Sequence, residues 1–169
     1  MMTTTTTNQK QTTITKDAAN KKLFVVREFN GTPEQVWKAW TESTLLDKWW
    51  APRPWKARTK TMDFREGGLW LYCMEGPQGE EHWCRIDYKT IVPNKSYTAV
   101  DAFCDENGNV TEQFPNMHWK NEFIKTETGT KVNVEITFSS LENLERIIEM
   151  GFKEGFTMAH SNLDELLAE

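Results

Sequence analysis

The sequence predicts an α+β fold in which a curved antiparallel sheet wraps around a long C-terminal helix. Two observations lead to this prediction: residues 55–138 show strand patterns separated by turn residues, and residues 139–168 have helical periodicity. A run of hairpin-linked strands has an apolar face that another element must cover. Because only the C-terminal segment is long enough to cover that face, we expect it to lie across the sheet.

The N-terminal residues differ in composition from the remainder. Residues 1–21 are rich in Thr, Asn and Gln and have no apolar run, so they cannot bury enough surface to offset the entropy of ordering. We expect them to be a disordered tail and residues 22–169 to form a single domain. No signal peptide is expected, and no later segment has the apolar length of a membrane span.

The first structured elements are predicted to be a strand and two short helices. Residues 23–29 are β-branched and aromatic, which favours a strand. Thr32 then supplies an N-cap and Pro33 a first helical position, so a helix is expected from Pro33 to about residue 41. A second helix, from residue 43 or 44 to residue 49, ends before two prolines that cannot continue it.

The middle of the chain is predicted to be a series of antiparallel strands. Glycine-containing turns separate these segments, and the last strand alternates strictly between apolar and polar residues, as expected when one face is buried. The expected strands are 55–63, 69–74, 82–92, 97–104, 117–125 and 131–138.

The C-terminal segment, residues 139–168, is predicted to be one amphipathic helix about 40 Å long. Gly151 and Gly155 lie one turn apart on its apolar face, where each costs about 1 kcal/mol relative to alanine. Two explanations remain open: close packing of the helix on a strand, or empty space beside it. With the sheet wrapped around this helix, the architecture is of the helix-grip type.

Five stretches of the chain together resemble a known family. In their order and spacing they resemble the SRPBCC or START-like superfamily, which includes the birch-pollen allergen. Within it, the chain is similar to bacterial homologues of the C-terminal domain of the activator of heat-shock protein 90 ATPase, over about residues 22–168. The stretches are TPEQVWKAWT (32–41), LLDKWWAP (45–52), GGLWLYCM (67–74), DAFCDENGN (101–109) and EMGFKEGF (149–156).

This resemblance implies a hollow between the sheet and the C-terminal helix, with the short helices near its mouth. We expect one of Trp49 and Trp50 to fill the core and the other to line the entrance. The residues expected to bind a ligand there are Trp50, Trp70, Tyr72, Met74, Arg85, Asp101, Phe103, Trp119, Gly151, Gly155 and Phe156.

Arg85, Asp101 and His160 are the polar residues of greatest interest. If Arg85 and Asp101 face inward from neighbouring strands, they form a buried charge pair that could orient a polar ligand group. If they face outward, they form a surface pair worth a few tenths of a kcal/mol. His160 lies beside the apolar face of the helix and could point into the hollow or into solvent.

Composition and spacing argue against several classes of function. The net charge is -5, without the basic stripe of a nucleic-acid binder. The three cysteines and three histidines show no disulfide or zinc spacing, so we expect a cytoplasmic protein without metal, cofactor or membrane partner. No catalytic residues can be named, because no local signature places a nucleophile beside a base. Eight Trp, nine Phe and three Tyr indicate either a wide aromatic core or an aromatic-lined pocket.

We therefore expect the protein to bind a small hydrophobic or aromatic molecule in the cavity between sheet and helix. One alternative is an enzyme resembling polyketide cyclases or hydrolases that uses the same cavity, although the lack of a catalytic constellation favours binding. Another is a co-chaperone-like interaction domain; a chaperone partner has less support, because no segment corresponds to the N-terminal half of the eukaryotic activator. The chain is expected to be a monomer or a homodimer.

Overall fold

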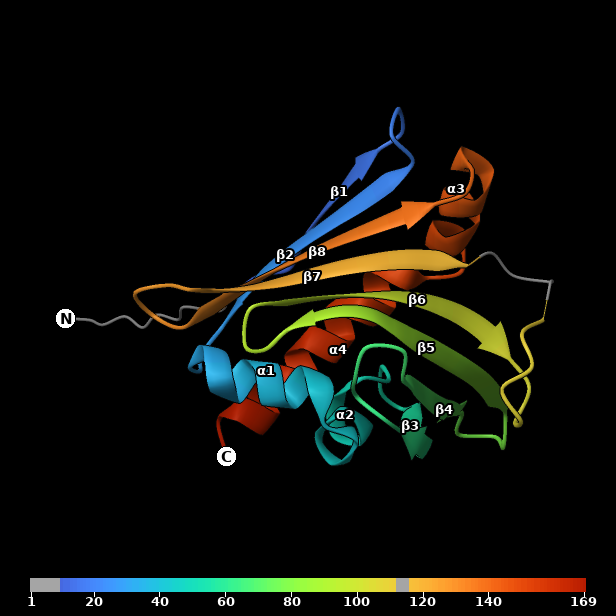
Figure 1. Ribbon diagram of the computed structural model, residues 1–169, viewed down its shortest axis with the longest axis horizontal. Helices are drawn as coiled ribbons and strands as arrows, with labels where there is room; N and C mark the ends of the chain where they lie inside the picture. The colour runs from blue at the N-terminus through green and yellow to red at the C-terminus, as the bar shows by residue number, and fades with distance from the viewer. Residues whose placement is uncertain (1–9, 112–115) are drawn as a thin grey trace.

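The computed structural model describes residues 10–111 and 116–169 as a curved antiparallel sheet with four helices (Figure 1). The strands follow the order β1-β2-β8-β7-β6-β5-β4-β3. The N-terminal strand β2 therefore pairs with β8, the last strand of the chain. The strands are β1 (Thr13–Asp17), β2 (Lys22–Phe29), β3 (Lys56–Met62), β4 (Leu69–Glu75), β5 (Glu81–Val92), β6 (Ser96–Cys104), β7 (Met117–Lys125) and β8 (Thr130–Phe138). The helices are α1 (Pro33–Thr41), α2 (Ser43–Trp49), α3 (Leu141–Glu149) and α4 (Phe152–Leu167).

The expected helix-grip fold is confirmed, and β2–β8, α1 and α2 lie within about one residue of their predicted bounds. Local signals explain this agreement. At the start of α1, the Thr32 hydroxyl accepts the backbone N–H of Gln35, and the Gln35 side chain accepts the backbone N–H of Thr32. This reciprocal cap satisfies two N–H groups that the helix itself leaves free.

The prediction that the disordered tail reaches residue 21 was wrong, because part of this segment forms a strand. Residues 13–17 form β1, which pairs with β2 at the edge of the sheet, and Ile14 packs on the core. Lys10 is also fixed, because its ammonium lies 2.7 Å from the Glu28 carboxylate. Composition could not predict this, since the order comes from pairing with a distant strand; residues 1–9 lie outside the described part of the chain.

The prediction of one continuous helix over residues 139–168 was also wrong. The segment is divided into α3 and α4 at Gly151, whose φ of 96° is left-handed. The N–H of Gly151 bonds to the carbonyl of Ile148, and that of Met150 to the carbonyl of Arg146, which closes the end of α3. A residue without a Cβ adopts this conformation at little cost, so the glycine makes the break.

The core lies between the concave face of the sheet and α1, α2 and α4. In Figure 1, α4 crosses the sheet beneath β5 and β6, and Ala159 and Leu163 on this helix are fully buried. Trp40 of α1 is central: its ring centroid lies 5.0–6.2 Å from those of Trp49, Trp50, Phe123 and Phe156. Within the described ranges, no helix is both long and apolar enough to span a membrane.

Candidate functional site

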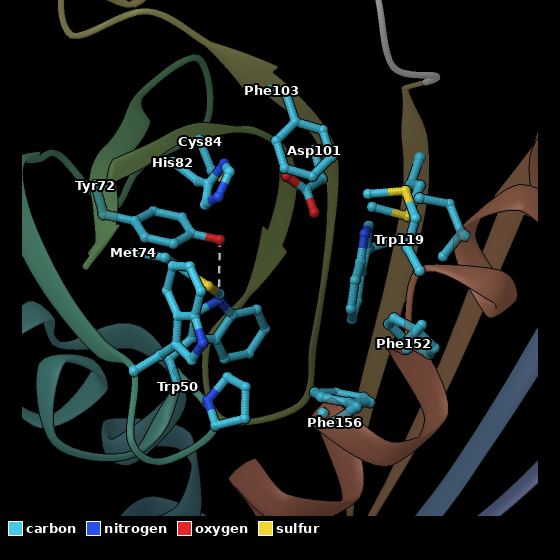
Figure 2. A pocket seen from close by; sticks show the side chains of 17 residues that line it. Trp50, Tyr72, Met74, His82, Cys84, Asp101, Phe103, Trp119, Phe152 and Phe156 are labelled. Carbon is cyan, nitrogen blue, oxygen red and sulfur yellow. Dashed lines mark hydrogen bonds between the residues drawn. The ribbon is translucent and has the colours of Figure 1, made fainter. Parts of the chain in front are cut away.

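A cavity of about 400 Å³ lies between the sheet and the junction of α3 with α4 (Figure 2). Its walls come from β4, β5, β6 and β7 on one side, from α3 and α4 on the other, and from the segment after α2. Six of the predicted site residues supply apolar or aromatic wall: Trp50, Tyr72, Met74, Phe103, Trp119 and Phe156.

Three further predicted residues, Asp101, Gly151 and Gly155, also line the cavity. A Cβ added at Gly155 would meet only the Pro52 Cγ atom, at 3.6 Å, and one at Gly151 would meet nothing within 4 Å. Empty space beside the helix is therefore the correct explanation for Gly155, and close packing on a strand is wrong. Gly151 is explained by its left-handed backbone instead.

Trp50 and Tyr72 connect two walls of the cavity. Trp50 follows α2, and its indole Nε1 donates a 2.9 Å hydrogen bond to the Tyr72 hydroxyl on β4, as the dashed line in Figure 2 marks. Trp49 is fully buried, does not line the cavity, and donates to the Ala39 carbonyl at 2.9 Å. Trp49 thus fills the core while Trp50 lines the cavity, which resolves the two roles left open for this pair.

Trp70 and Arg85 were predicted to be at the site but do not line the cavity. Trp70 lies behind Tyr72, with ring centroids 4.0 Å apart, and its Nε1 donates to the Thr59 hydroxyl at 2.9 Å. Arg85 is on the opposite face of the sheet, where it donates to both carboxylate oxygens of Asp87, at 2.6 and 2.9 Å.

The predicted Arg85–Asp101 charge pair does not form. Between β5 and β6, Arg85 is opposite Ala102 and Asp101 is opposite Ile86, so the two charged side chains lie on different faces of the sheet. Arg85 also donates to the Gly108 carbonyl at 2.7 Å. The inward alternative holds for Asp101 alone, and the outward one for Arg85.

Asp101 is the one carboxyl group among the described residues that line the cavity, and only 8% of the residue is exposed. Burial raises its pKa to about 7, although a hydrogen bond from the backbone N–H of Ala102 acts in the opposite direction. Within the described part of the chain, no cation forms an ion pair with it. Asp101 is therefore poised between its neutral and charged forms near neutral pH.

Two neighbouring groups, the Tyr72 hydroxyl and the Cys84 thiol, remain neutral. Burial raises the pKa of the Tyr72 hydroxyl and that of the Cys84 thiol well above their ordinary values. A thiol in such surroundings is a poor nucleophile, because the thiolate is the reactive form. In the described ranges, no group of three or more His, Cys, Asp or Glu side chains is arranged to hold a metal ion.

His160 is buried behind the cavity rather than in it. Its ring lies against Phe156, with centroids 4.2 Å apart, and its Nδ1 lies 2.7 Å from the Thr12 hydroxyl. Burial, and to a lesser extent the charge of Arg27, lower its pKa to about 3. The ring is consequently neutral and serves as part of the core.

Several lining residues were not predicted from the sequence. Cys84 could have been, because strand alternation places it on the face opposite Arg85. The others depend on where α3 turns and on how the segment after α2 folds over the mouth. The lining residues missed include Pro52, Trp55, His82, Met117, Ile147 and Phe152.

A second hollow, of about 660 Å³, shares Trp55 with the first but differs in character. Charged side chains line it, among them Asp47, Arg53 and Glu165, and Arg53 and Glu165 form an exposed ion pair at 2.9 Å. Its surface offers no continuous aromatic wall. The first cavity is therefore the candidate site for an apolar ligand.

Comparison with known proteins shows close structural relatives. The solution structure of a protein from Arthrobacter aurescens is 29% identical, with a TM-score of 0.87, over 92% of this chain and 91% of that one. Protein Ms6760 from Mycobacterium smegmatis is 27% identical, with a TM-score of 0.85, over 92% and 96%. The AHSA1 protein from Silicibacter pomeroyi, 18% identical with a TM-score of 0.69 over 87% and 97%, shares the fold.

No protein in a search of curated sequences matches the chain. The family model described as "Activator of Hsp90 ATPase homolog 1-like protein" matches residues 30–168. This match covers all elements of the fold from α1 to α4, including every residue that lines the aromatic cavity. The chain therefore belongs to the family of activator of Hsp90 ATPase homolog 1-like proteins.

Proposed function

We propose that the protein binds a small hydrophobic or aromatic molecule in the cavity between the sheet and the α3–α4 junction. The observation that carries this proposal is a cavity of about 400 Å³ walled by aromatic side chains and left open beside Gly155. Small-molecule sites in proteins have volumes of about 300–1,000 Å³ and are mostly apolar, with a few polar groups. The fold of this family generally binds hydrophobic ligands.

Binding is favoured over catalysis because the polar groups around the cavity do not form an acid–base pair with Asp101. An acid–base enzyme needs a second group to exchange a proton with Asp101 or to hold the substrate against it. Arg85, the expected partner, is on the other face of the sheet, and His160 is buried behind Phe156. Tyr72 and Cys84 stay protonated because burial raises their pKa values. His82 also lines the cavity, but its imidazole packs against the Trp55 ring, with centroids 5.4 Å apart.

We also propose a reducing, cytoplasmic setting. Cys73, Cys84 and Cys104 are all free and buried, and the pKa of each thiol is raised by burial. Unpaired cysteines in a stable core suit a compartment in which disulfides are not formed.

Thermal-shift and amide-NMR screens against fatty acids, flavonoids, sterols and aromatic polyketides test the proposed binding. A ligand at one hundred times its dissociation constant should stabilise the protein by about 2.7 kcal/mol. Amide shifts should cluster on Tyr72, Trp119 and residues 151–156.

A pair of variants at Gly155 controls for binding elsewhere. Gly155→Leu should fill the cavity and abolish binding, whereas Gly155→Ala should bind normally, because a methyl group there meets only Pro52 at an ordinary distance. Binding that survives in Gly155→Leu, or shifts that map to the charged hollow around Asp47 and Glu165, would contradict the proposed site.

A further inference from the structure

Two buried polar groups of opposite hydrogen-bonding character face the cavity without a side-chain partner. The Asp101 carboxyl forms no ion pair and no side-chain hydrogen bond with a described residue, and only the backbone N–H of Ala102 lowers its pKa. The indole Nε1 of Trp119 is fully buried and has no hydrogen-bond partner among the described residues. Leaving such a group unsatisfied costs about 1–3 kcal/mol, so each is a place where a ligand group would be stabilised.

The sheet places these two groups near each other. Asp101 on β6 is opposite Met117 on β7, and Ala99 is opposite Trp119. Asp101 and Trp119 are therefore diagonal neighbours on the same face. In Figure 2 both side chains project into the cavity, and the nitrogen-bearing edge of the Trp119 indole is turned toward the Asp101 carboxyl.

The rest of the surroundings are apolar. Phe103 lies beside Asp101 in Figure 2, and Phe152 and Phe156 lie beside Trp119, with ring centroids 6.4 and 5.7 Å from the indole. Across the cavity, the Trp50 indole N–H donates to the Tyr72 hydroxyl oxygen, and the Tyr72 hydroxyl in turn donates to the Cys84 sulfur. A ligand thus meets aromatic wall on most sides and one acceptor–donor pair on the sheet.

The chemistry of this pair selects a functional group. When Asp101 is ionised, its carboxylate only accepts hydrogen bonds, whereas the Trp119 indole N–H only donates them. A hydroxyl group can serve both, because its hydrogen points to Asp101 while its oxygen accepts from Trp119. An ammonium has no lone pair for Trp119, an ether has no hydrogen for Asp101, and a ligand carboxylate is repelled by Asp101.

We propose that the cavity selects aromatic or polycyclic compounds bearing a hydroxyl group, which is held between the Asp101 carboxyl and the Trp119 indole N–H. This proposal rests on the proposed function, since it assumes that an apolar ligand occupies this cavity. It adds the group by which such a ligand is recognised and the end of the ligand that lies against β6 and β7.

Three naphthalene compounds of similar size test the proposal by isothermal titration calorimetry at pH 8.5, above the pKa of about 7 of Asp101, so that this group is a carboxylate. 2-Naphthol can donate and accept, 2-methoxynaphthalene can only accept, and 2-naphthoate carries a negative charge. The wild-type protein should bind 2-naphthol about tenfold more tightly than 2-methoxynaphthalene, as one hydrogen bond to a carboxylate predicts. It should bind 2-naphthoate most weakly.

Variants assign the discrimination to the two residues. In Asp101→Leu the two neutral compounds should bind with affinities within about threefold of each other, because the acceptor is lost. In Trp119→Phe, 2-naphthol and 2-methoxynaphthalene should both bind more weakly, because the oxygen of each compound loses the same indole donor. The ratio of their dissociation constants should stay as in the wild type. Asp101→Asn retains an acceptor oxygen and should retain part of the preference. It also keeps the test decisive if Asp101→Leu does not fold.

Matched substitutions on the other face of the sheet provide controls. Asp87→Leu and Trp83→Phe should leave the preference for 2-naphthol unchanged, since neither residue lines the cavity. Equal affinity for the two neutral compounds, or tightest binding of 2-naphthoate, would overturn the hydroxyl proposal but leave ligand binding intact. If the wild-type protein bound none of the three, the hydroxyl proposal would fail, and the screen against fatty acids, flavonoids, sterols and aromatic polyketides would decide the proposed function separately.

Discussion

Nε1 of Trp50 donates a hydrogen bond to the Tyr72 hydroxyl, and this single contact ties the end of α2 to the middle of β4. Tyr72→Phe should leave the buried indole N–H without a partner and lower the free energy of unfolding by about 1–3 kcal/mol. Urea denaturation measures this loss. Tyr88→Phe is the control, because the Tyr88 hydroxyl makes only a 3.8 Å contact with the Met62 sulfur. If Tyr72→Phe and Tyr88→Phe lowered the free energy of unfolding equally, the hydrogen bond from Trp50 would not contribute measurably to stability.

The two glycines of the C-terminal segment should respond oppositely to alanine. Gly155→Ala should raise the free energy of unfolding by about 1 kcal/mol, since alanine favours the helix and has room there. Gly151→Ala should lower it by about 1–2 kcal/mol, because its φ of 96° is unfavourable for a residue with a Cβ. Thermal unfolding of the two variants beside wild type tests this. A loss at Gly155 would mean that the space beside α4 is not available.

Asp101 should make stability fall as pH rises. Its pKa is about 7 in the folded protein and 3.8 ordinarily, so the folded state retains a proton that the unfolded state has lost. Its contribution is complete below about pH 4 and is lost as pH rises through 7. Tyr72, Cys84 and Tyr88, which influence or are influenced by Asp101, stay neutral in this window because burial raises their pKa values.

The measurement is the free energy of unfolding of wild type minus that of Asp101→Asn, from pH 4 to pH 8. This difference should decrease by a few kcal/mol, since each pKa unit corresponds to about 1.4 kcal/mol. A difference that does not change with pH would mean that the carboxyl is solvated in the folded protein.

His160 should act in the opposite direction at acidic pH. Burial lowers its pKa to about 3 from an ordinary 6.5, so the unfolded state gains a proton that the folded state does not accept. The stabilising contribution is complete above pH 6.5 and is lost as pH falls toward 3. Wild type should therefore lose stability relative to His160→Phe between these values, as urea denaturation at a series of pH values would show. If the free energies of unfolding of wild type and His160→Phe differed by the same amount at every pH, the variant would have lost only the contact with Thr12.

The parts of the fold that could be predicted depend on neighbouring residues in the sequence. The cap formed by Thr32 and Gln35 is such a signal, as is the turn at Gly67, whose φ is 85°. Strand β1 could not be predicted, because its polar residues are ordered by backbone pairing with β2. The break at Gly151 was missed because the apolar periodicity continues through it, and a left-handed glycine looks the same in sequence as a helical one.

The candidate site was predictable to a similar degree. Alternation along β4 correctly placed Tyr72 and Met74 on the inner face, but it could not show that Trp70, on the same face, lies behind Tyr72. Arg85 was ambiguous because alternation gives two faces without saying which one the helices cover. His160 was undecided because its surroundings, Thr12 and Phe29, are more than one hundred residues away in sequence.

The division at Gly151 also places an exposed residue, Met150, at the mouth of the cavity, directly before the left-handed glycine. Helix α4 carries the buried residues Ala159 and Leu163 that hold the molecule together, while α3 contributes Ile147 to the cavity wall. Met150 lines the cavity and is 49% exposed, whereas Ile147 is buried in the core, so under the proposed function a substitution at Met150 is the one expected to change ligand selectivity without disturbing the interior. The exposed end of α3 at Met150 is accordingly the position to diversify when new selectivity is engineered, while the buried residues of α3 and α4 are left intact.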